Sequence, residues 1–259
     1  MRDPDSFPEP ALPMSTDPAV RLSVVIPAFN EARRLPRTLD DVVDYLGRQP
    51  YRAEVVVVDD GSSDDTARLV RERPAAATPI RLIAHTDGRN HGKGATVRRG
   101  MAEAVGQYRV FMDADNSTVL AHIDAFWPWF EQGFDVVIGS RDIDGADVVL
   151  HQPWLKELGG KVGNLIIRAL AAPGIADTQA GFKMFTARCI EDILPRLTIE
   201  RWGFDVELIV AARCRGFRVK ELPIRWVNNT ASTVPAVAYL QVLGEVWRVR
   251  KQRAAGRYA

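Results

Sequence analysis

The sequence predicts an α/β protein with a mostly parallel central sheet and helices on both faces. Short runs of apolar, often β-branched residues alternate with segments of helical periodicity through the first half of the chain. Several of these apolar runs stop at acidic or glycine-containing loops, and open α/β sheets bind their ligands at such strand ends. Strands that alternate with helices run parallel, and a parallel sheet needs helices over both of its faces.

The elements expected in the first half follow from these patterns. Strands are predicted at 22–28, 54–58, 80–84, 108–112 and 134–138. Helices are predicted at 35–46, 64–70, 95–105 and 119–130. The helix at 35–46 illustrates the reasoning, because its apolar residues recur at the spacing that places them on one face of a helix.

After residue 141 the alternation of strands and helices is weaker. Helices are predicted at 154–172, 204–214 and 234–251. The segment 217–227 is strand-like but is interrupted by Pro223, and the segment 177–186 is polar at first and then mixed.

This organisation predicts one domain over residues 21–248. Residues 21–141 would form a nucleotide-binding half, and residues 142–248 would form the other side of the site. Residues 1–20 are rich in proline and acidic residues and are predicted to be a flexible tail. Residues 249–259 are predicted to be a basic C-terminal tail.

Composition and charge narrow the class of protein. The chain has 259 residues, of which 46% are hydrophobic and 26% charged, which excludes disordered, collagen-like and coiled-coil proteins. A net charge of +1 argues against a nucleic-acid partner. Cys189 and Cys214 form no redox motif and fit a reducing, cytoplasmic compartment. The chain has no signal-like segment and no run of about 18 uncharged apolar residues, so no membrane-spanning helix is expected.

Acidic and polar residues gather just after three predicted strands, at 27–31, 59–64 and 113–115. Each group alone could be a turn or a helix cap. Three groups at one sheet edge, however, bring carboxylates together and require a compensating cation or cationic ligand. Asp113 and Asp115 would face the same way in an extended segment, and two such oxygen donors suit Mg²⁺ or Mn²⁺ with diphosphate oxygens as further ligands.

The segment Gly92-Lys93-Gly94 opens a predicted helix after the third strand. Glycine lets the backbone approach an anion, and the helix N-terminus favours negative charge. The sequence does not match a Walker A loop, and it has no G-x-G-x-x-G fingerprint, which argues against a nicotinamide or flavin site.

Together these motifs resemble the family 2 glycosyltransferases of GT-A fold. The first-half motifs are VVIPAFNE at 24–31, VVVDDGS at 56–62, GKG at 92–94 and DAD at 113–115. In the second half, DTQAGFK at 177–183 and IERWGFDVE at 199–207 are similar to the dolichyl-phosphate β-glucosyltransferase branch and its bacterial polyprenyl-phosphate relatives. The resemblance runs from about Leu22 to Arg248.

The resemblance implies an inverting transfer of a hexose or N-acetylhexosamine from a nucleotide sugar to a polyprenyl phosphate, as a step in cell-envelope glycan synthesis. It favours UDP over GDP as the nucleotide, and it leaves open glucose, N-acetylgalactosamine, galactose or mannose as the sugar. The enzyme would act at the inner face of a membrane as a peripheral protein, and a homo-oligomer stays open. The predicted membrane contacts are the amphipathic segments 161–172 and 234–253, each of which could instead pack on the core.

The resemblance also implies a role for individual residues. The residues implied for the nucleotide sugar are Pro27, Asn30, Glu31, Asp59, Asp60, Lys93, Asp113 and Asp115, of which Asp113 and Asp115 would also hold the metal. The residues implied for the acceptor are Gln179, Lys183, Arg201 and Trp202. The residues implied for catalysis are Asp115, Asp177 and Arg201, with Asp177 as a base or a sugar-positioning carboxylate.

The implied chemistry needs little proton transfer, because a phosphate monoester with a second pKa near 6 is already an anionic nucleophile. Lys93 and a divalent cation would stabilise the leaving diphosphate, while Arg201 and Lys183 would offset repulsion between the two anionic substrates. Two other hypotheses remain open at this stage. A soluble saccharide or small-molecule acceptor would make a base such as Asp177 indispensable. A non-catalytic scaffold that only binds a nucleotide sugar would not need the D-x-D motif, Lys93 and Arg201 all together.

The sequence departs from the pattern of that branch in three places. Residues 116–118 read Asn-Ser-Thr after the D-x-D motif, which leaves the sugar open, and Ala180 stands where cysteine is common. The N-terminal membrane helix of the eukaryotic enzymes has no counterpart in residues 1–20. The four histidines show no metal-ligand spacing and are interpreted as incidental, with a place near the phosphates left open for His91 alone.

Overall fold

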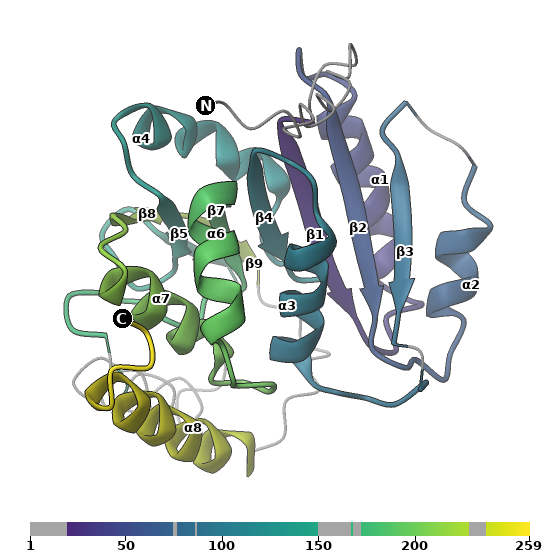
Figure 1. Cartoon of the computed structure of the whole chain (residues 1–259). Helices are drawn as coiled ribbons and strands as arrows, with labels where there is room; N and C mark the ends of the chain where they lie inside the picture. The colour runs from purple at the N-terminus through teal and green to yellow at the C-terminus, as the bar shows by residue number, and fades with distance from the viewer. Residues whose placement is uncertain (1–19, 75–76, 86, 150–166, 168–171, 228–236) are drawn as a thin grey trace, which may run out of the picture.

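A computed structural model describes residues 20–74, 77–85, 87–149, 167, 172–227 and 237–259 (Figure 1). Its centre is a seven-stranded sheet in the order β3-β2-β1-β4-β7-β5-β8. The strands are β1 (Leu22–Ala28), β2 (Ala53–Asp59), β3 (Ile80–Ala84), β4 (Tyr108–Met112), β5 (Val136–Ser140), β7 (Phe182–Thr186) and β8 (Val219–Pro223). Only β7 runs antiparallel to its neighbours β4 and β5, so the mostly parallel sheet is confirmed.

A second, two-stranded parallel sheet pairs β6 (Asp147–Val149) with β9 (Arg225–Val227). It belongs to the second half of the chain, where the predicted segment 217–227 divides into β8, which ends at Pro223, and β9, with Ile224 between them. The division places β8 in the main sheet beside β5 and β9 beside β6.

Nine helical segments among the described residues surround the strands. They are α1 (Leu35–Leu46), α2 (Thr66–Arg71), α3 (Lys93–Glu103), the 3₁₀ helix η1 (Leu120–Ala125), α4 (Trp127–Glu131), α6 (Ala187–Ile193), the 3₁₀ helix η2 (Leu194–Arg196), α7 (Phe204–Cys214) and α8 (Val237–Ala254). In Figure 1, α3 and α6 lie in front of the sheet and α1 lies behind it.

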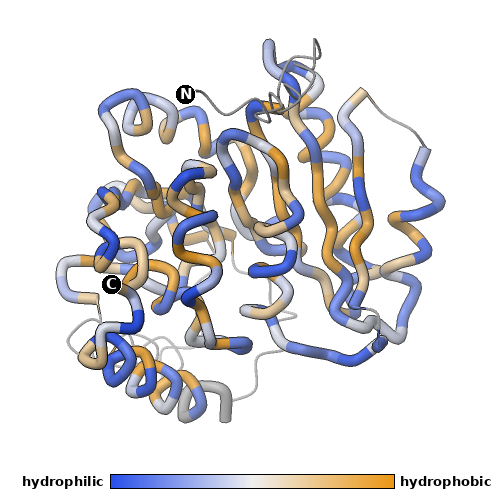
Figure 2. Tube along the Cα trace, in the orientation of Figure 1, coloured by the Kyte–Doolittle hydropathy of each residue, from blue (hydrophilic) through white to orange (hydrophobic). Residues whose placement is uncertain are grey.

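Apolar side chains fill both faces of the sheet, as the sequence predicts. β1 sends Val25 into a core cluster shared with α3, α6, α7 and α8, and it sends Val24 and Ile26 into a second cluster shared with α1 and α4. All three side chains are fully buried. Figure 2 shows the apolar strands along the middle of the trace and more polar residues on the helices around them.

Several element boundaries differ from the prediction. The predicted helix 119–130 consists of η1 and the separate short helix α4, in which Pro128 cannot donate the backbone hydrogen bond of a continuous helix. The short elements β6 and α6 were not predicted, and most of the predicted helix 154–172 lies outside the described residues.

The C-terminal end is part of the folded domain, which corrects the predicted boundary at residue 248 and the predicted tail at 249–259. α8 continues to Ala254, and the side chains of Val249 and Tyr258 are buried in the core cluster. The hydroxyl group of Tyr258 donates a hydrogen bond to Glu207 Oε1 at 2.8 Å. Residues 1–19 of the predicted N-terminal tail lie outside the described residues. No helix in the described part of the chain is both long and apolar enough to cross a bilayer.

Candidate active site

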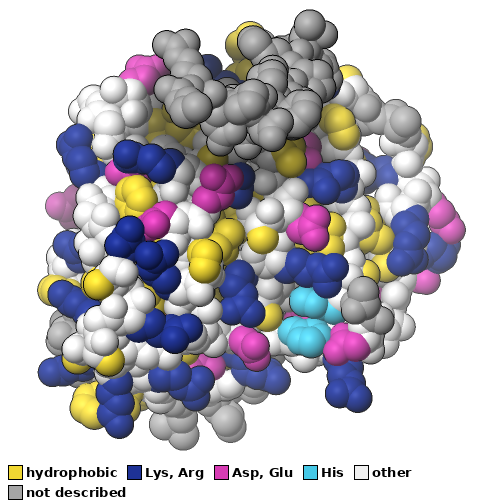
Figure 3. Space-filling view, in the orientation of Figure 1, with side chains coloured by type: hydrophobic (Ala, Val, Ile, Leu, Met, Phe, Trp, Pro, Cys, Tyr) yellow, Lys and Arg dark blue, Asp and Glu magenta, His cyan; other side chains and the backbone are white. Residues whose placement is uncertain are grey.

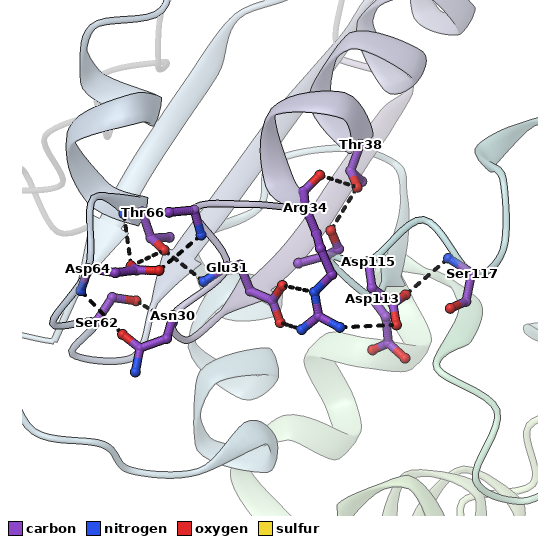
Figure 4. Close-up of polar contacts among 12 residues, drawn as sticks. Asn30, Glu31, Arg34, Thr38, Ser62, Asp64, Thr66, Asp113, Asp115 and Ser117 are labelled. Carbon is purple, nitrogen blue, oxygen red and sulfur yellow. Dashed lines mark hydrogen bonds and ion pairs between the residues drawn. The ribbon is translucent and has the colours of Figure 1, made fainter. Parts of the chain in front are cut away.

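The carboxyl ends of β1, β2, β4 and β5 lie at one edge of the sheet, because these four strands point the same way. The loops that follow them carry most of the predicted site residues, and Figure 4 shows the part of this edge formed by β1, β2 and β4. The topology therefore brings together acidic residues that are far apart in the sequence, as predicted.

The loops after β1 and β2 are joined by side-chain hydrogen bonds. Asn30 has a φ of 56°, which asparagine tolerates better than most residues, and its Oδ1 accepts a hydrogen bond from Ser63 N at 2.8 Å. Ser62 Oγ accepts from Asn30 N at 2.9 Å, and Thr66 Oγ1 accepts from Glu31 N at 2.8 Å (Figure 4). Asn30 therefore joins the loop after β1 to the loop after β2. Its predicted contact with the nucleotide sugar stays a prediction.

Asp59 and Asp60 are both buried at the end of β2. Asp60 accepts hydrogen bonds from His91 N at 2.8 Å and Gly92 N at 2.9 Å, and Asp59 accepts from Ser62 N at 3.3 Å. Both oxygens of Asp60 are thus engaged by the loop that leads into α3. Its predicted contact with the base or ribose stays a prediction, as does that of Pro27, which is half-buried at the end of β1.

The loop in front of α3 carries a stacked pair of histidines. The ring centroids of His85 and His91 lie 4.3 Å apart, and His91 Nε2 lies 2.9 Å from Asp87 Oδ1. Figure 3 shows two adjoining histidine side chains on this face of the molecule, with Lys and Arg side chains nearby. Burial is the main cause that lowers the pKa of His85, and the neighbouring His91 acts in the same direction. His91 therefore borders the start of α3, where the diphosphate is expected.

Gly92 allows the second half of the chain to reach the start of α3. Its φ is 96°, and a Cβ atom there would lie 2.7 Å from the carbonyl oxygen of Glu200 and 2.9 Å from Arg201 Cγ. Ala95 N donates to the same Glu200 oxygen at 2.9 Å. Arg201, which is exposed, is therefore placed next to the Gly92-Lys93 segment, and Trp202 packs half-buried against the core.

Asp113 and Asp115 each contact a different cation of the protein. Lys93 Nζ lies 2.5 Å from Asp113 Oδ1, and Arg34 Nη1 lies 3.9 Å from Asp115 Oδ2. The motif leaves the strand in a turn at Ala114 and Asp115, whereas the prediction assumed an extended segment. A Cβ atom at Gly181 would overlap the carboxylate of Asp113, so the backbone just before β7 approaches this side chain closely.

Arg34 also binds Glu31, which is the third acidic residue at this edge. Arg34 Nε donates to Glu31 Oε2 at 2.6 Å, and Arg34 Nη2 donates to Oε1 (Figure 4). Burial raises the pKa of Glu31, although Arg34 acts in the opposite direction. Sequence reasoning missed Arg34, which lies three residues beyond the strand-end motif in the N-cap position of α1.

The carboxylate oxygens at this edge fit a hard divalent cation whose remaining ligands are water and substrate oxygens. Among the residues that the structure describes, no group of three or more His, Cys, Asp or Glu side chains could hold a metal ion by itself. Asp113 and Asp115 nevertheless supply carboxylate oxygens, and both already attract a positive charge. Mg²⁺ and Mn²⁺ are bound in this way, through one or two carboxylates together with water and substrate phosphates.

Asp177 is buried and paired with Arg141. Arg141 Nε lies 2.7 Å from Asp177 Oδ2 and Nη2 lies 3.0 Å from Oδ1, a two-pronged contact. Burial acts to raise the pKa of Asp177, but the charge and the hydrogen bonds of Arg141, together with the charge of Lys183, outweigh burial and lower that pKa below its usual range. Glu221 accepts hydrogen bonds from the backbone of Ala176 and Asp177 at 2.8 and 2.9 Å, which holds the turn in place.

Arg141 is a second residue that the sequence reasoning missed. It follows the carboxyl end of β5, its side chain is 30% exposed, and its Cζ lies 5.3 Å from the centre of the Trp226 ring. The signal was its place three residues after the predicted strand 134–138, in Gly139-Ser140-Arg141, at the end of a strand where ligands bind. Gln179 lies half-buried beside this pair and donates its backbone N–H to Asp177 Oδ1 at 3.2 Å.

Lys183 lies beneath the site, which corrects its predicted place beside an acceptor phosphate. Its side chain is fully buried in β7, where Nζ donates to the Ala180 carbonyl oxygen at 2.5 Å and to the carboxylate of Asp205. Burial lowers the pKa of Lys183 and raises that of Asp205. The pair is therefore an internal element of the domain that joins β7 to the start of α7.

Fold and site together define a glycosyltransferase of the GT-A type. The chain belongs to glycosyl transferase family 2, whose family model matches residues 23–194. It is 32% identical over 244 residues to the dolichyl-phosphate beta-glucosyltransferase of Dictyostelium discoideum, covering 89% of this chain and 74% of that protein. It is 31% identical to the Mus musculus enzyme of the same name, covering 95% and 83%. These matches confirm the resemblance that the motifs predict.

Solved structures share the fold at low sequence identity. The structure of mannosyl-3-phosphoglycerate synthase from Rubrobacter xylanophilus has a TM-score of 0.67 and 19% identity, covering 92% of this chain and 75% of that one. Glucosyl-3-phosphoglycerate synthase from Mycobacterium tuberculosis, solved with Mn²⁺, UDP and glucosyl-3-phosphoglycerate, has a TM-score of 0.54 and 20% identity, covering 92% and 80%. Both are GT-A glycosyltransferases, so the predicted fold class is confirmed.

Proposed function

We propose that this glycosyltransferase transfers a hexose or N-acetylhexosamine, with inversion, from a UDP-sugar to a polyprenyl phosphate. The observation that supports the proposal is the packing of the Arg201 segment on the start of α3, next to Gly92 and Ala95, because it brings a basic segment of the second half to the helix that begins with Lys93. The names of the dolichyl-phosphate relatives support the acceptor, and the neighbour solved with UDP and Mn²⁺ supports the donor.

On the donor side, Lys93 lies at the N-terminus of α3 and would contact the diphosphate, because helix N-termini favour anions. Pro27 and Glu31 would border the base and ribose. Asp113 and Asp115 would hold Mg²⁺ or Mn²⁺, and the bound cation would neutralise charge on the leaving diphosphate. The protein then has to hold the sugar so that the acceptor oxygen can attack from the side opposite the diphosphate.

On the acceptor side, the main task is to bring two anions together. A polyprenyl phosphate needs no strong base, because it is already ionised near neutral pH. Arg201 is exposed near Lys93, and Arg141 presents a partly exposed guanidinium group next to Trp226. Asp177 then serves to position Arg141. We expect the two arginines to bind the acceptor phosphate and lower its repulsion from the donor.

The state of Asp177 favours this acceptor over a soluble saccharide or small molecule. A hydroxyl acceptor must lose a proton, and a base works best when its pKa lies near the working pH. Asp177 is buried, paired with Arg141 through both oxygens and shifted to a lower pKa, which are poor properties for a base. A non-catalytic scaffold is the least favoured alternative, because it would not need the acidic edge, Lys93 and Arg201 together.

The outer face of α8 supports a peripheral position at the inner face of a membrane. Val242, Val246 and Val249 pack inward, whereas Trp247 is 50% exposed. The charged groups of Arg250 and Lys251 each lie 5.7 Å from the centre of the Trp247 ring. An exposed tryptophan among basic residues suits an anionic lipid surface.

The position of α8 would bring such a surface close to the acceptor segment. Glu245 on its inner side accepts a hydrogen bond from Gly203 N at 2.6 Å, two residues after Arg201. In Figure 1, α8 lies along the lower side of the molecule, the side on which the arrows of β2 and β3 end. A lipid phosphate held in that surface would therefore face the same edge as the nucleotide sugar.

Vesicle binding tests the membrane part of the proposal. Removing two basic residues in R250Q/K251Q should weaken binding to phosphatidylglycerol-containing vesicles, measured by sedimentation, by about 30-fold, at about 1 kcal/mol per charge. The matched control R48Q/R71Q removes two exposed cations from the α1 and α2 region and should bind as the unaltered protein does. Equal weakening in both variants would exclude α8 as the specific contact.

The reaction itself is tested with purified protein, Mg²⁺ or Mn²⁺, and a panel of UDP- and GDP-sugars. Each donor is incubated with a short polyprenyl phosphate or with soluble saccharides, and products are identified by mass spectrometry. We expect lipid-phosphate-sugar from one donor, and its loss with chelator or in D115A. Donor binding without any lipid product would refute the lipid acceptor, and product on a saccharide would support the alternative.

A further inference from the structure

Arg34 occupies the centre of the acidic edge and contacts two of its carboxylates (Figure 4). It grips Glu31 through Nε and Nη2, and its Nη1 atom lies 3.9 Å from Asp115 Oδ2. The three side chains are only 13–22% exposed, so water screens their charges incompletely. Arg34 is thus a counter-ion shared between the loop after β1 and the D-x-D motif.

A second link fixes this arrangement. Thr38, one turn into α1, donates its backbone N–H to the Arg34 carbonyl oxygen at 3.3 Å. Its hydroxyl group donates to the carbonyl oxygen of Ala114, the central residue of the motif, at 2.7 Å. Thr38 is fully buried. The start of α1 and the D-x-D turn therefore move as one unit, and the closeness of Arg34 to Asp115 is built into the fold.

Each carboxylate of the motif consequently has a protein cation at the place where a metal would bind. Lys93 serves Asp113, and Arg34 serves Asp115. A divalent cation that binds Asp115 has to compete with Arg34 for the same oxygen atoms. The diphosphate of the donor is an anion that offers the displaced guanidinium group a new partner.

We propose that Arg34 couples metal binding to nucleotide binding, by competing with the divalent cation for Asp115 and by pairing with the diphosphate once the nucleotide is present. Metal alone then binds weakly, and metal with nucleotide binds well. The inference rests on the proposed function, because it assumes a metal-dependent nucleotide-sugar donor. Such a coupling is reciprocal, so the metal raises nucleotide affinity by the same factor as the nucleotide raises metal affinity.

The test measures Mn²⁺ binding to the full chain by the electron paramagnetic resonance signal of free Mn²⁺, with and without UDP. In R34Q we expect Mn²⁺ alone to bind about fivefold tighter or more, and the gain from added UDP to shrink by a similar factor. R33Q is the matched control, because it removes the same charge from the exposed neighbouring residue, and it should behave as the unaltered protein does. R34K keeps a positive charge near Asp115 and should stay closer to the unaltered protein than R34Q.

Thermal melts and circular dichroism would establish that the variants fold, and R34M, which removes the same charge, takes the place of R34Q if R34Q does not fold. Mn²⁺ affinity in R34Q that equals R33Q, or falls below it, would overturn the inference. Equal tightening in R34K and R34Q would also overturn it, because the charge would then have no part. An unaltered protein that binds neither Mn²⁺ nor UDP would instead refute the proposed function, and the inference with it.

Discussion

The buried pair of Lys183 and Asp205 allows a test of whether Lys183 stabilises the fold or contacts the acceptor. Lys183 is fully buried and Asp205 is 4% exposed, so neither side chain can turn to water when its partner is removed. Removing one partner of such a pair typically lowers the free energy of unfolding by about 3–5 kcal/mol, against about 0–1 kcal/mol for an exposed pair. K183M replaces the lysine with an apolar side chain of similar length and leaves Asp205 uncompensated. We therefore expect a loss in the upper range.

Urea unfolding followed by circular dichroism would measure this loss. The double variant K183M/D205L removes both charges and should recover most of the stability, because a well-packed apolar pair can replace a buried ion pair. R68M breaks the exposed pair with Asp65 at the start of α2 and serves as the matched control, with a far smaller loss, because water screens this pair. If K183M were as stable as R68M but raised the KM for polyprenyl phosphate, the buried role would be refuted and the predicted acceptor contact restored.

Three further predictions address the site and the domain boundary. G92A should reduce turnover by up to about 100-fold, because its Cβ would displace the Glu200 backbone, whereas G88A, at a φ of 63° with no atom within 4 Å of a Cβ, should retain most activity. D177N should lower the free energy of unfolding at pH 7. The free energies of the two proteins should converge as the pH falls below 3.8 and through the lowered pKa of folded Asp177, because the ionised carboxylate stabilises the fold and is lost over this range. Truncation of residues 249–259 should destabilise the domain by several kcal/mol in urea unfolding, since it removes buried Val249 and Tyr258; an unchanged midpoint would restore the predicted tail.

Local pattern was sufficient for most of the first half of the chain. β1, α1, β3 and β4 begin and end at the predicted residues, and α7 does so in the second half. In each of these segments the apolar residues keep the spacing of a helix or of a buried strand from end to end, and burial of these apolar side chains dominates the free energy of folding. The same pattern placed the acidic loops at one edge, because parallel strands necessarily share a carboxyl end.

Prediction failed where two weak signals competed or where an element was very short. The segment 119–130 has a helical pattern, yet Pro128 divides it into η1 and α4. β6 has only three residues, and it exists because β9 lies beside it. The end of the chain is basic and reads as a tail, but Tyr258 finds a buried acceptor in Glu207, 51 residues earlier.

The sequence by itself therefore determined the class of fold, the family and the edge at which the chemistry lies. The tertiary structure alone decided which charge meets which. Arg34 with Asp115, Arg141 with Asp177 and Lys183 with Asp205 are separated in the sequence by 22 residues or more, and nothing local to either partner distinguishes a buried pair from an exposed one. The physical reason is that apolar burial repeats with the period of a helix or strand, whereas the energy of a charge depends on its distance to other charges and to water, which only the packed chain sets.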